Sequence, residues 1–82
     1  MNKTEFIEQV QEPYKDLWKI LVIAQQASTS KSQEVWDMFG READRYCKLY
    51  PDKDKNPFGY RCARFLLDAA EDIEKMNNGG EI

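Results

Sequence analysis

The stretch PDKDKNPFG, in the second half of the chain, has the residue types of a calcium site. Asp52, Asp54 and Asn56 stand at alternating positions, as the first three ligands of a helix–loop–helix calcium loop do. The sixth position of such a loop needs a positive φ, but here Pro57 holds φ near −65°. The twelfth position needs a glutamate and is Ala63. The stretch therefore predicts a helix start, with Asn56 as the N-cap and Pro57 as the first helical residue.

The chain has two cysteines and no histidine. Without histidine it lacks the commonest general base, and two thiols alone do not complete a tetrahedral zinc site. Gly40 and Gly59 are isolated and form no phosphate-binding loop. We therefore expect no enzymatic activity, no catalytic residues, no metal site and no cofactor. Cys47 and Cys62 are expected to be reduced thiols in the core, with a redox-sensitive disulfide as the alternative.

Basic side chains flank the same predicted loop on two successive helices. These candidate partner-binding residues are Arg41, Arg45 and Lys48, spaced at i, i+4 and i+7, together with Tyr60, Arg61 and Arg64. If the two helices form a hairpin, these side chains could form one patch. Arginine beside tyrosine is typical of interface anchors and of phosphate contacts. The alternative is ordinary ion pairing along each helix, for example between Asp44 and Lys48.

The charge balance favours a protein partner for this patch over nucleic acid. With 12 basic and 15 acidic residues the net charge is −3, which opposes tracking of a phosphate backbone. Nucleic acid is therefore the less favoured partner. The apolar run LWKILVIA is too short to span a bilayer, and the N-terminal sequence has no apolar signal core. We expect a soluble cytoplasmic protein without membrane association.

Three periodic segments must position these residues. The first begins at Asn2, whose spacing to Glu5 indicates a capping box. Pro13 lies inside this segment, so we expect one long helix kinked there, with two consecutive helices as the alternative. The apolar stripe of the segment keeps its phase across Pro13 and comprises Phe6, Val10, Tyr14, Leu17, Leu21 and Ala24.

The second and third segments predict an antiparallel helical hairpin. Ser30 with Gln33 indicates a helix that starts near residue 31 and ends at Pro51. Its stripe is Val35, Phe39, Ala43, Tyr46 and Tyr50. The last helix should run from Pro57 to about Met76, with an apolar face of Phe58, Cys62, Phe65, Leu66, Ala69, Ile73 and Met76. We predict an all-α three-helix bundle in one domain, 1–78, with a flexible tail at 79–82.

The later half of the first helix is apolar all round, which predicts self-association. Trp18, Ile20 and Ile23 are the candidate dimer contacts, because a chain of 82 residues builds only a small core. In composition the chain resembles small phage or mobile-element proteins that act by binding a host or competitor protein. We predict a non-catalytic protein-binding module, an inhibitor or regulator of a larger protein. The alternative is a helical protein that binds a phosphate ligand or nucleic acid through its arginines.

Overall fold

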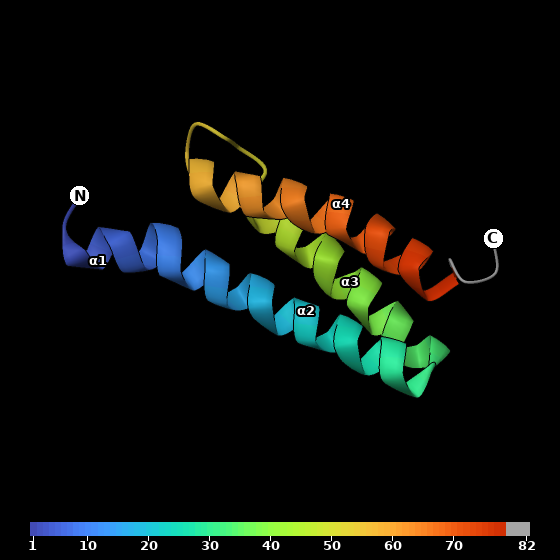
Figure 1. The fold of residues 1–82 in the computed structure, drawn as a ribbon. Helices are drawn as coiled ribbons and strands as arrows, with labels where there is room; N and C mark the ends of the chain where they lie inside the picture. Colours follow the sequence, from blue (N-terminus) through green and yellow to red (C-terminus); the bar gives the residue numbers. More distant parts are fainter. Residues whose placement is uncertain (79–82) are drawn as a thin grey trace.

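Helices account for nearly all of residues 1–78, the part of the chain that the computed structural model describes. The elements are α1 (Lys3–Phe6), a π-helical turn η1 (Ile7–Gln11), α2 (Glu12–Ser30), α3 (Gln33–Leu49) and α4 (Pro57–Asn78). The first three elements follow one another without a break, so the chain forms three long helices (Figure 1). The predicted all-α bundle is confirmed, and the predicted tail lies outside the described residues. None of the described helices combines the length and apolarity needed to cross a bilayer.

The first helix begins at the predicted cap and passes Pro13 through a wider turn. Asn2 Oδ1 accepts a hydrogen bond from the Glu5 amide at 2.8 Å. Proline has no amide hydrogen and its ring crowds the preceding turn, which strains a regular α-helix. Here η1 occupies the turn before Pro13, and the Glu12 amide donates to the Ile7 carbonyl, five residues earlier. The helix therefore continues past Pro13, and a kink in its axis stays a prediction.

The junction between α2 and α3 lies two residues later than expected, so the predicted cap at Ser30 is wrong. Ser30 is the last residue of α2, and its hydroxyl donates to the Gln26 carbonyl at 2.7 Å. Lys31 then adopts the left-handed conformation, with φ of 54°, and ends the helix. Ser32 is the true cap, because its side chain accepts from the Val35 amide at 3.4 Å. Both serines have capping chemistry, but Ser30 uses its hydroxyl within α2.

The loop between α3 and α4 has the structure predicted for PDKDKNPFG. Asp52 Oδ1 accepts from the Asp54 amide at 2.8 Å, which closes a turn. Asn56 Oδ1 accepts from the Gly59 amide at 2.8 Å, and α4 begins at Pro57. The prediction of a capped helix start is confirmed. Figure 1 shows this loop at one end of the bundle, where α3 enters it and α4 leaves it.

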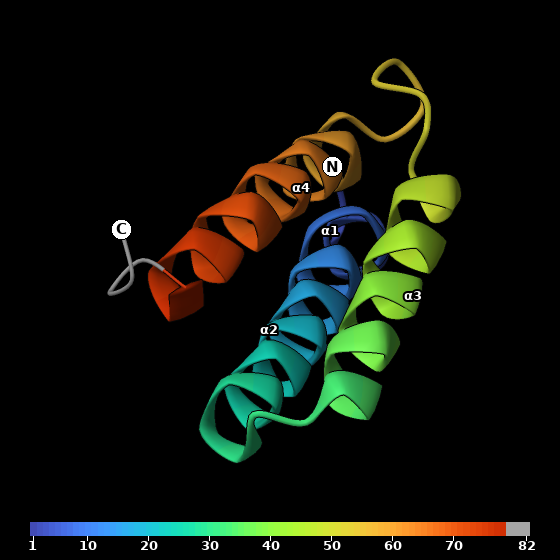
Figure 2. The ribbon, with the colours of Figure 1, turned by 90° about the vertical axis from the view of Figure 1, so that its right-hand side faces the viewer.

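The core lies along the axis of the triangle that α2, α3 and α4 form (Figure 2). The buried residues of α3 match its predicted stripe, with Phe39, Ala43 and Tyr46 at the centre. In α2 the buried side chains follow one another at intervals of three and four residues: Pro13, Leu17, Ile20, Ala24 and Ala27. This stripe shares Leu17 and Ala24 with the predicted one, but Pro13 and Ile20 take the places of Tyr14 and Leu21. Several residues of the predicted apolar faces lie at the surface instead: Phe6, Tyr14, Phe65 and Met76.

Candidate binding groove

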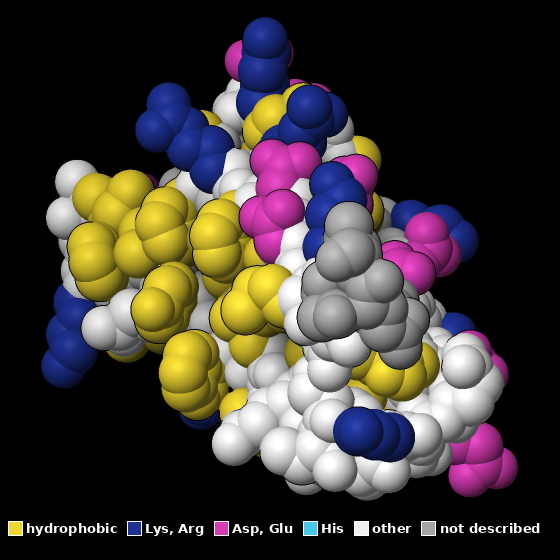
Figure 3. Space-filling model, turned by 45° about the vertical axis from the view of Figure 1, so that its right-hand side comes forward, with side chains coloured by type: hydrophobic (Ala, Val, Ile, Leu, Met, Phe, Trp, Pro, Cys, Tyr) yellow, Lys and Arg dark blue, Asp and Glu magenta, His cyan; other side chains and the backbone are white. Residues whose placement is uncertain are grey.

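An apolar groove runs between α2 and α4 and has a volume of about 450 Å³. Figure 3 shows hydrophobic side chains gathered on this face of the molecule. The lining residues are Tyr14, Leu17, Trp18 and Leu21 from α2, and Phe58, Arg61, Cys62 and Phe65 from α4. A second hollow continues along the same two helices and shares Leu21 with the first, so the groove extends towards Ile73 and Met76.

Three aromatic side chains stand around this groove more than half exposed. The exposed fractions are 56% for Tyr14, 60% for Trp18 and 56% for Phe65. Scattered apolar side chains are normal at protein surfaces, but contiguous ones mark interaction sites. Tyrosine and tryptophan are also enriched at protein interfaces, because they combine a large apolar ring with a polar group. The groove therefore has the character of a binding surface.

The helical periodicity of α2 explains why these side chains remain at the surface. Tyr14 and Leu21 lie three residues before and four residues after Leu17, so all three belong to one side of the helix. Leu17 reaches the core, and Trp18 lies further round towards solvent. In a three-helix arrangement each helix buries only one stripe. A helix that is apolar all round therefore leaves a second apolar stripe uncovered, and in α2 that stripe borders α4.

Within residues 1–78, Arg61 is the one charged side chain that lines the groove. It forms no ion pair with any acidic side chain among the described residues. The groove can therefore accept an apolar segment that places a carboxylate beside Arg61.

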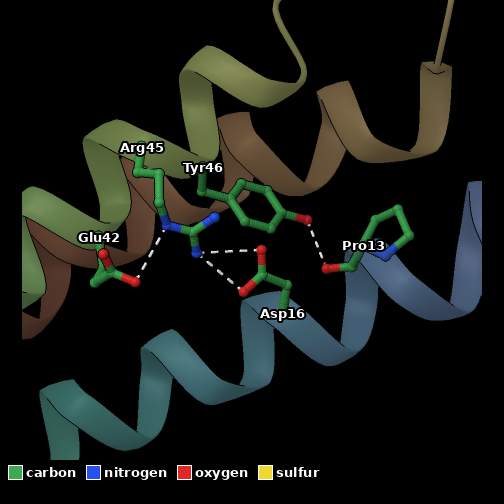
Figure 4. A network of polar contacts seen from close by, with 5 residues as sticks. All are labelled: Pro13, Asp16, Glu42, Arg45 and Tyr46. Carbon is green, nitrogen blue, oxygen red and sulfur yellow. Dashed lines mark hydrogen bonds and ion pairs between the residues drawn. The ribbon is translucent and has the colours of Figure 1, made fainter.

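Two of the predicted patch residues, Arg45 and Lys48, form ion pairs within the bundle. Arg45 donates to both carboxylate oxygens of Asp16, at 3.0 and 3.2 Å, and to Glu42 at 3.2 Å (Figure 4). This network joins α3 to α2, and the hydrogen bond to Asp16 raises the pKa of Arg45 above its ordinary value. Asp16 and Trp18 point to different sides of α2, so Arg45 and the groove residue Arg61 lie apart. Arg45 thus has a structural role between α2 and α3, and a patch shared by all the basic candidates stays a prediction.

The remaining basic candidates lie on the surface of α3 and α4. Lys48 pairs with Asp44 at 2.9 Å, one helical turn earlier, as the ion-pairing alternative predicts. Arg41 and Arg64 are exposed, and Tyr60 is half-buried. The alternative of phosphate or nucleic-acid binding through these side chains stays a prediction.

The three predicted dimer contacts have different places in the structure. Trp18 is exposed in the groove, but Ile20 is only 1% exposed and belongs to the core. Ile20 has no surface left for a second copy, so its place among the dimer contacts is wrong. Ile23 is partly buried and packs against the core. The apolar side chains of this part of α2 are thus divided between the core and the groove.

The buried polar groups of the bundle have structural partners. The Tyr46 hydroxyl donates to the Pro13 carbonyl at 2.7 Å, and burial raises the pKa of Tyr46 far above its ordinary value (Figure 4). Cys47 and Cys62 are free thiols, and burial raises the pKa of both. A raised pKa keeps a thiol protonated and unreactive. Among the described residues no group of cysteine and carboxylate side chains could hold a metal ion.

Comparison with protein families, with curated proteins and with solved structures finds no match for this chain. The groove is therefore the feature on which a functional assignment must rest.

Proposed function

We propose that this chain is a non-catalytic, cytoplasmic protein-binding module. It binds a larger protein through the α2–α4 groove and acts as a small inhibitor or regulator. The observation that carries this proposal is the group of Tyr14, Trp18 and Phe65, all more than half exposed around one apolar groove. Exposing three large aromatic side chains together disfavours the free chain in water, and a partner that covers them removes this cost.

The shape and lining of the groove support an apolar helix or extended segment as the bound element. Amphipathic helices commonly bind by placing their apolar face in a groove between two helices. Aromatic side chains at the centre of such an interface carry most of the binding free energy. Arg61 would add orientation, because a carboxylate of the partner can pair with it at the edge of the apolar contact.

The test is affinity capture from a lysate of the source organism with tagged variants of the chain. The groove variant combines Trp18→Asp with Phe65→Asp. The matched control is Leu67→Asp, which changes an exposed apolar residue of α4 outside the groove. We expect one protein to be retained by the wild type and by the control, with or without nuclease, and to be lost from the groove variant.

Circular dichroism of each variant confirms that its helices are intact before capture. Retention by the groove variant would contradict the proposed binding site. Retention that disappears after nuclease treatment would contradict the proposed function and restore the nucleic-acid alternative, because counterion-driven binding needs the phosphate backbone.

A further inference from the structure

One edge of α4, beside the groove, carries an ordered series of exposed side chains. Arg61, Phe65, Asp68 and Asp72 follow one another at intervals of four, three and four residues, so they lie on a single side of the helix. All four are exposed, and Arg61 and Phe65 also line the groove. The same surface is therefore apolar at its centre and charged on both sides of the centre.

The charges of α4 are distributed unevenly along its length. Its N-terminal half carries Arg61 and Arg64 and no acidic residue, whereas its C-terminal half carries one lysine, Lys75, and four acidic residues, Asp68, Glu71, Asp72 and Glu74. The helix dipole favours the opposite order, with acidic side chains near the N-terminus and basic ones near the C-terminus. Pairing within α4 does not explain the order either, because Glu71 with Lys75 is its one ion pair among the described residues.

We propose that a second copy of this chain covers the groove, with the two α4 helices antiparallel about a two-fold axis that passes their exposed sides at the level of residues 66 and 67. In this register Arg61 of each copy faces Asp72 of the other. Arg64 lies close to Asp68 of the other copy in the same register, because the two pairs are centred at 66.5 and 66, within half a residue of each other. A two-fold interface must be complementary to itself, and a helix that is basic in one half and acidic in the other meets that condition when it is antiparallel to its copy.

The apolar part of the surface fits the same arrangement. Phe65 lies next to the two-fold axis and enters the groove of the other copy, where it meets Trp18. The contact buries the exposed aromatic side chains of both copies at its centre and leaves the ion pairs at the edge, which is the usual anatomy of a protein interface. This inference goes beyond the proposed function, since it needs no other partner, and a second copy and a larger protein would compete for the same groove.

The first test is sedimentation equilibrium of the full chain over a range of concentrations in low salt. We expect the mass to rise from that of one chain, 9.7 kDa, towards twice that value. Arg61→Asp and Asp72→Arg should each weaken the dimer about tenfold or more, because each replaces two symmetry-related attractive pairs by repulsive ones. The control Arg41→Asp changes the same charge on an exposed residue of α3 and should leave the dimer unchanged.

Mixing the two variants gives the decisive result. A heterodimer of Arg61→Asp with Asp72→Arg has opposite charges at both contacts, so the mixture should associate about as strongly as the wild type. A single-chain mass at every concentration would overturn the proposal. It would also be overturned by variants that associate like the wild type, or by a mixture that associates no better than its components.

The same variants separate this inference from the proposed function. Asp72→Arg changes a residue outside the groove lining and leaves Tyr14, Trp18 and Phe65 in place, so a chain with this substitution is expected to retain the groove. Capture of the partner protein by Asp72→Arg, with a monomeric wild type, would overturn the dimer alone. A dimer that follows the charge pattern, without any captured protein, would overturn the proposed function alone.

Discussion

Tyr46 is the side chain that most directly joins the second long helix to the first. It is fully buried, and its hydroxyl donates to the Pro13 carbonyl at 2.7 Å. The centroid of its ring lies 5.0 Å from the centroid of the Tyr50 ring. A buried hydroxyl is costly unless it is hydrogen-bonded, so this contact fixes where α3 meets α2. The hydrogen bond therefore also fixes how deeply the Tyr46 ring lies in the core.

We predict that Tyr46→Phe lowers the free energy of unfolding by about 1 kcal/mol, the usual net value of one hydrogen bond. The ring and its packing are retained, and only the donor is removed. Urea unfolding followed by circular dichroism measures the change. The control is Tyr14→Phe, an exposed tyrosine, which should change stability by less than about 0.5 kcal/mol. Equal effects of the two substitutions would contradict a role for the hydroxyl.

At the scale of the helices, two glycines have opposite environments. A Cβ atom at Gly59 would lie 2.5 Å from Cδ1 of Tyr50, so the tyrosine ring rests directly on the start of α4. At Gly40, in the middle of α3, a Cβ would have no atom within 4 Å apart from those of its chain neighbours and of the helix backbone around it. Gly59 is therefore required by packing, whereas Gly40 leaves its helix less stable than alanine would.

We predict that Gly59→Ala destabilises the chain by roughly 1–3 kcal/mol, because the ring of Tyr50 must move away. Gly40→Ala should stabilise it by up to about 1 kcal/mol through helix propensity alone. The pair is compared by urea unfolding under identical conditions. The same sign for both substitutions would show that helix propensity, and not the contact with Tyr50, decides the outcome at residue 59.

The helices themselves were predictable because their signals are local. Asn2, Asn56 and Pro57 act within one turn of the residues they affect, and the structure confirms all three. The junction between α2 and α3 was not predictable in detail, since Ser30 and Ser32 have the same capping chemistry. The choice between them depends on where α2 ends, and the left-handed Lys31 fixes that point.

The candidate site was only partly predictable, because it depends on how the helices pack. Trp18 was expected at an interface, and its exposure agrees with a surface role. The sequence places Tyr14 and Phe65 on the apolar stripes of their helices, but periodicity identifies an apolar face without saying what covers it. The sequence alone could not show that Arg45 and Arg61 have different roles. Only the packing of α3 on α2 reveals that Arg45 pairs with Asp16.

At the scale of the whole molecule, the three helices form an elongated body of 47 × 20 × 17 Å. Figure 1 shows the N-terminal end of the first helix projecting beyond the start of α4. In such a body only one stripe of each helix can be buried, so much of the apolar surface must remain near water. The α2–α4 groove is where that surface is concentrated, and this links the small size of the core to the proposed binding role.

The buried titratable groups give the whole molecule a defined dependence on pH. The pKa values of Tyr46, Tyr50, Cys47 and Cys62 are all raised, in each case chiefly by burial. Each folded-state pKa therefore exceeds its unfolded value, which is about 8.5 for a thiol and about 10 for a phenol. The unfolded chain then loses its protons at a lower pH than the folded chain does. It follows that the stability contributed by these groups is complete below the unfolded values and is lost as the pH rises above them.

We predict that the urea midpoint is constant from neutral pH to about pH 8 and falls steadily towards about pH 10.5. A reducing agent in all samples keeps both thiols free. Tyr46→Phe should start from a lower midpoint and fall less steeply above about pH 10, because it lacks the group whose pKa is raised most. Tyr14→Phe should follow the wild-type curve. A midpoint that stays constant up to about pH 10.5 would mean that these groups ionise as readily in the folded chain as in the unfolded one, and that burial of Tyr46 does not oppose its ionisation.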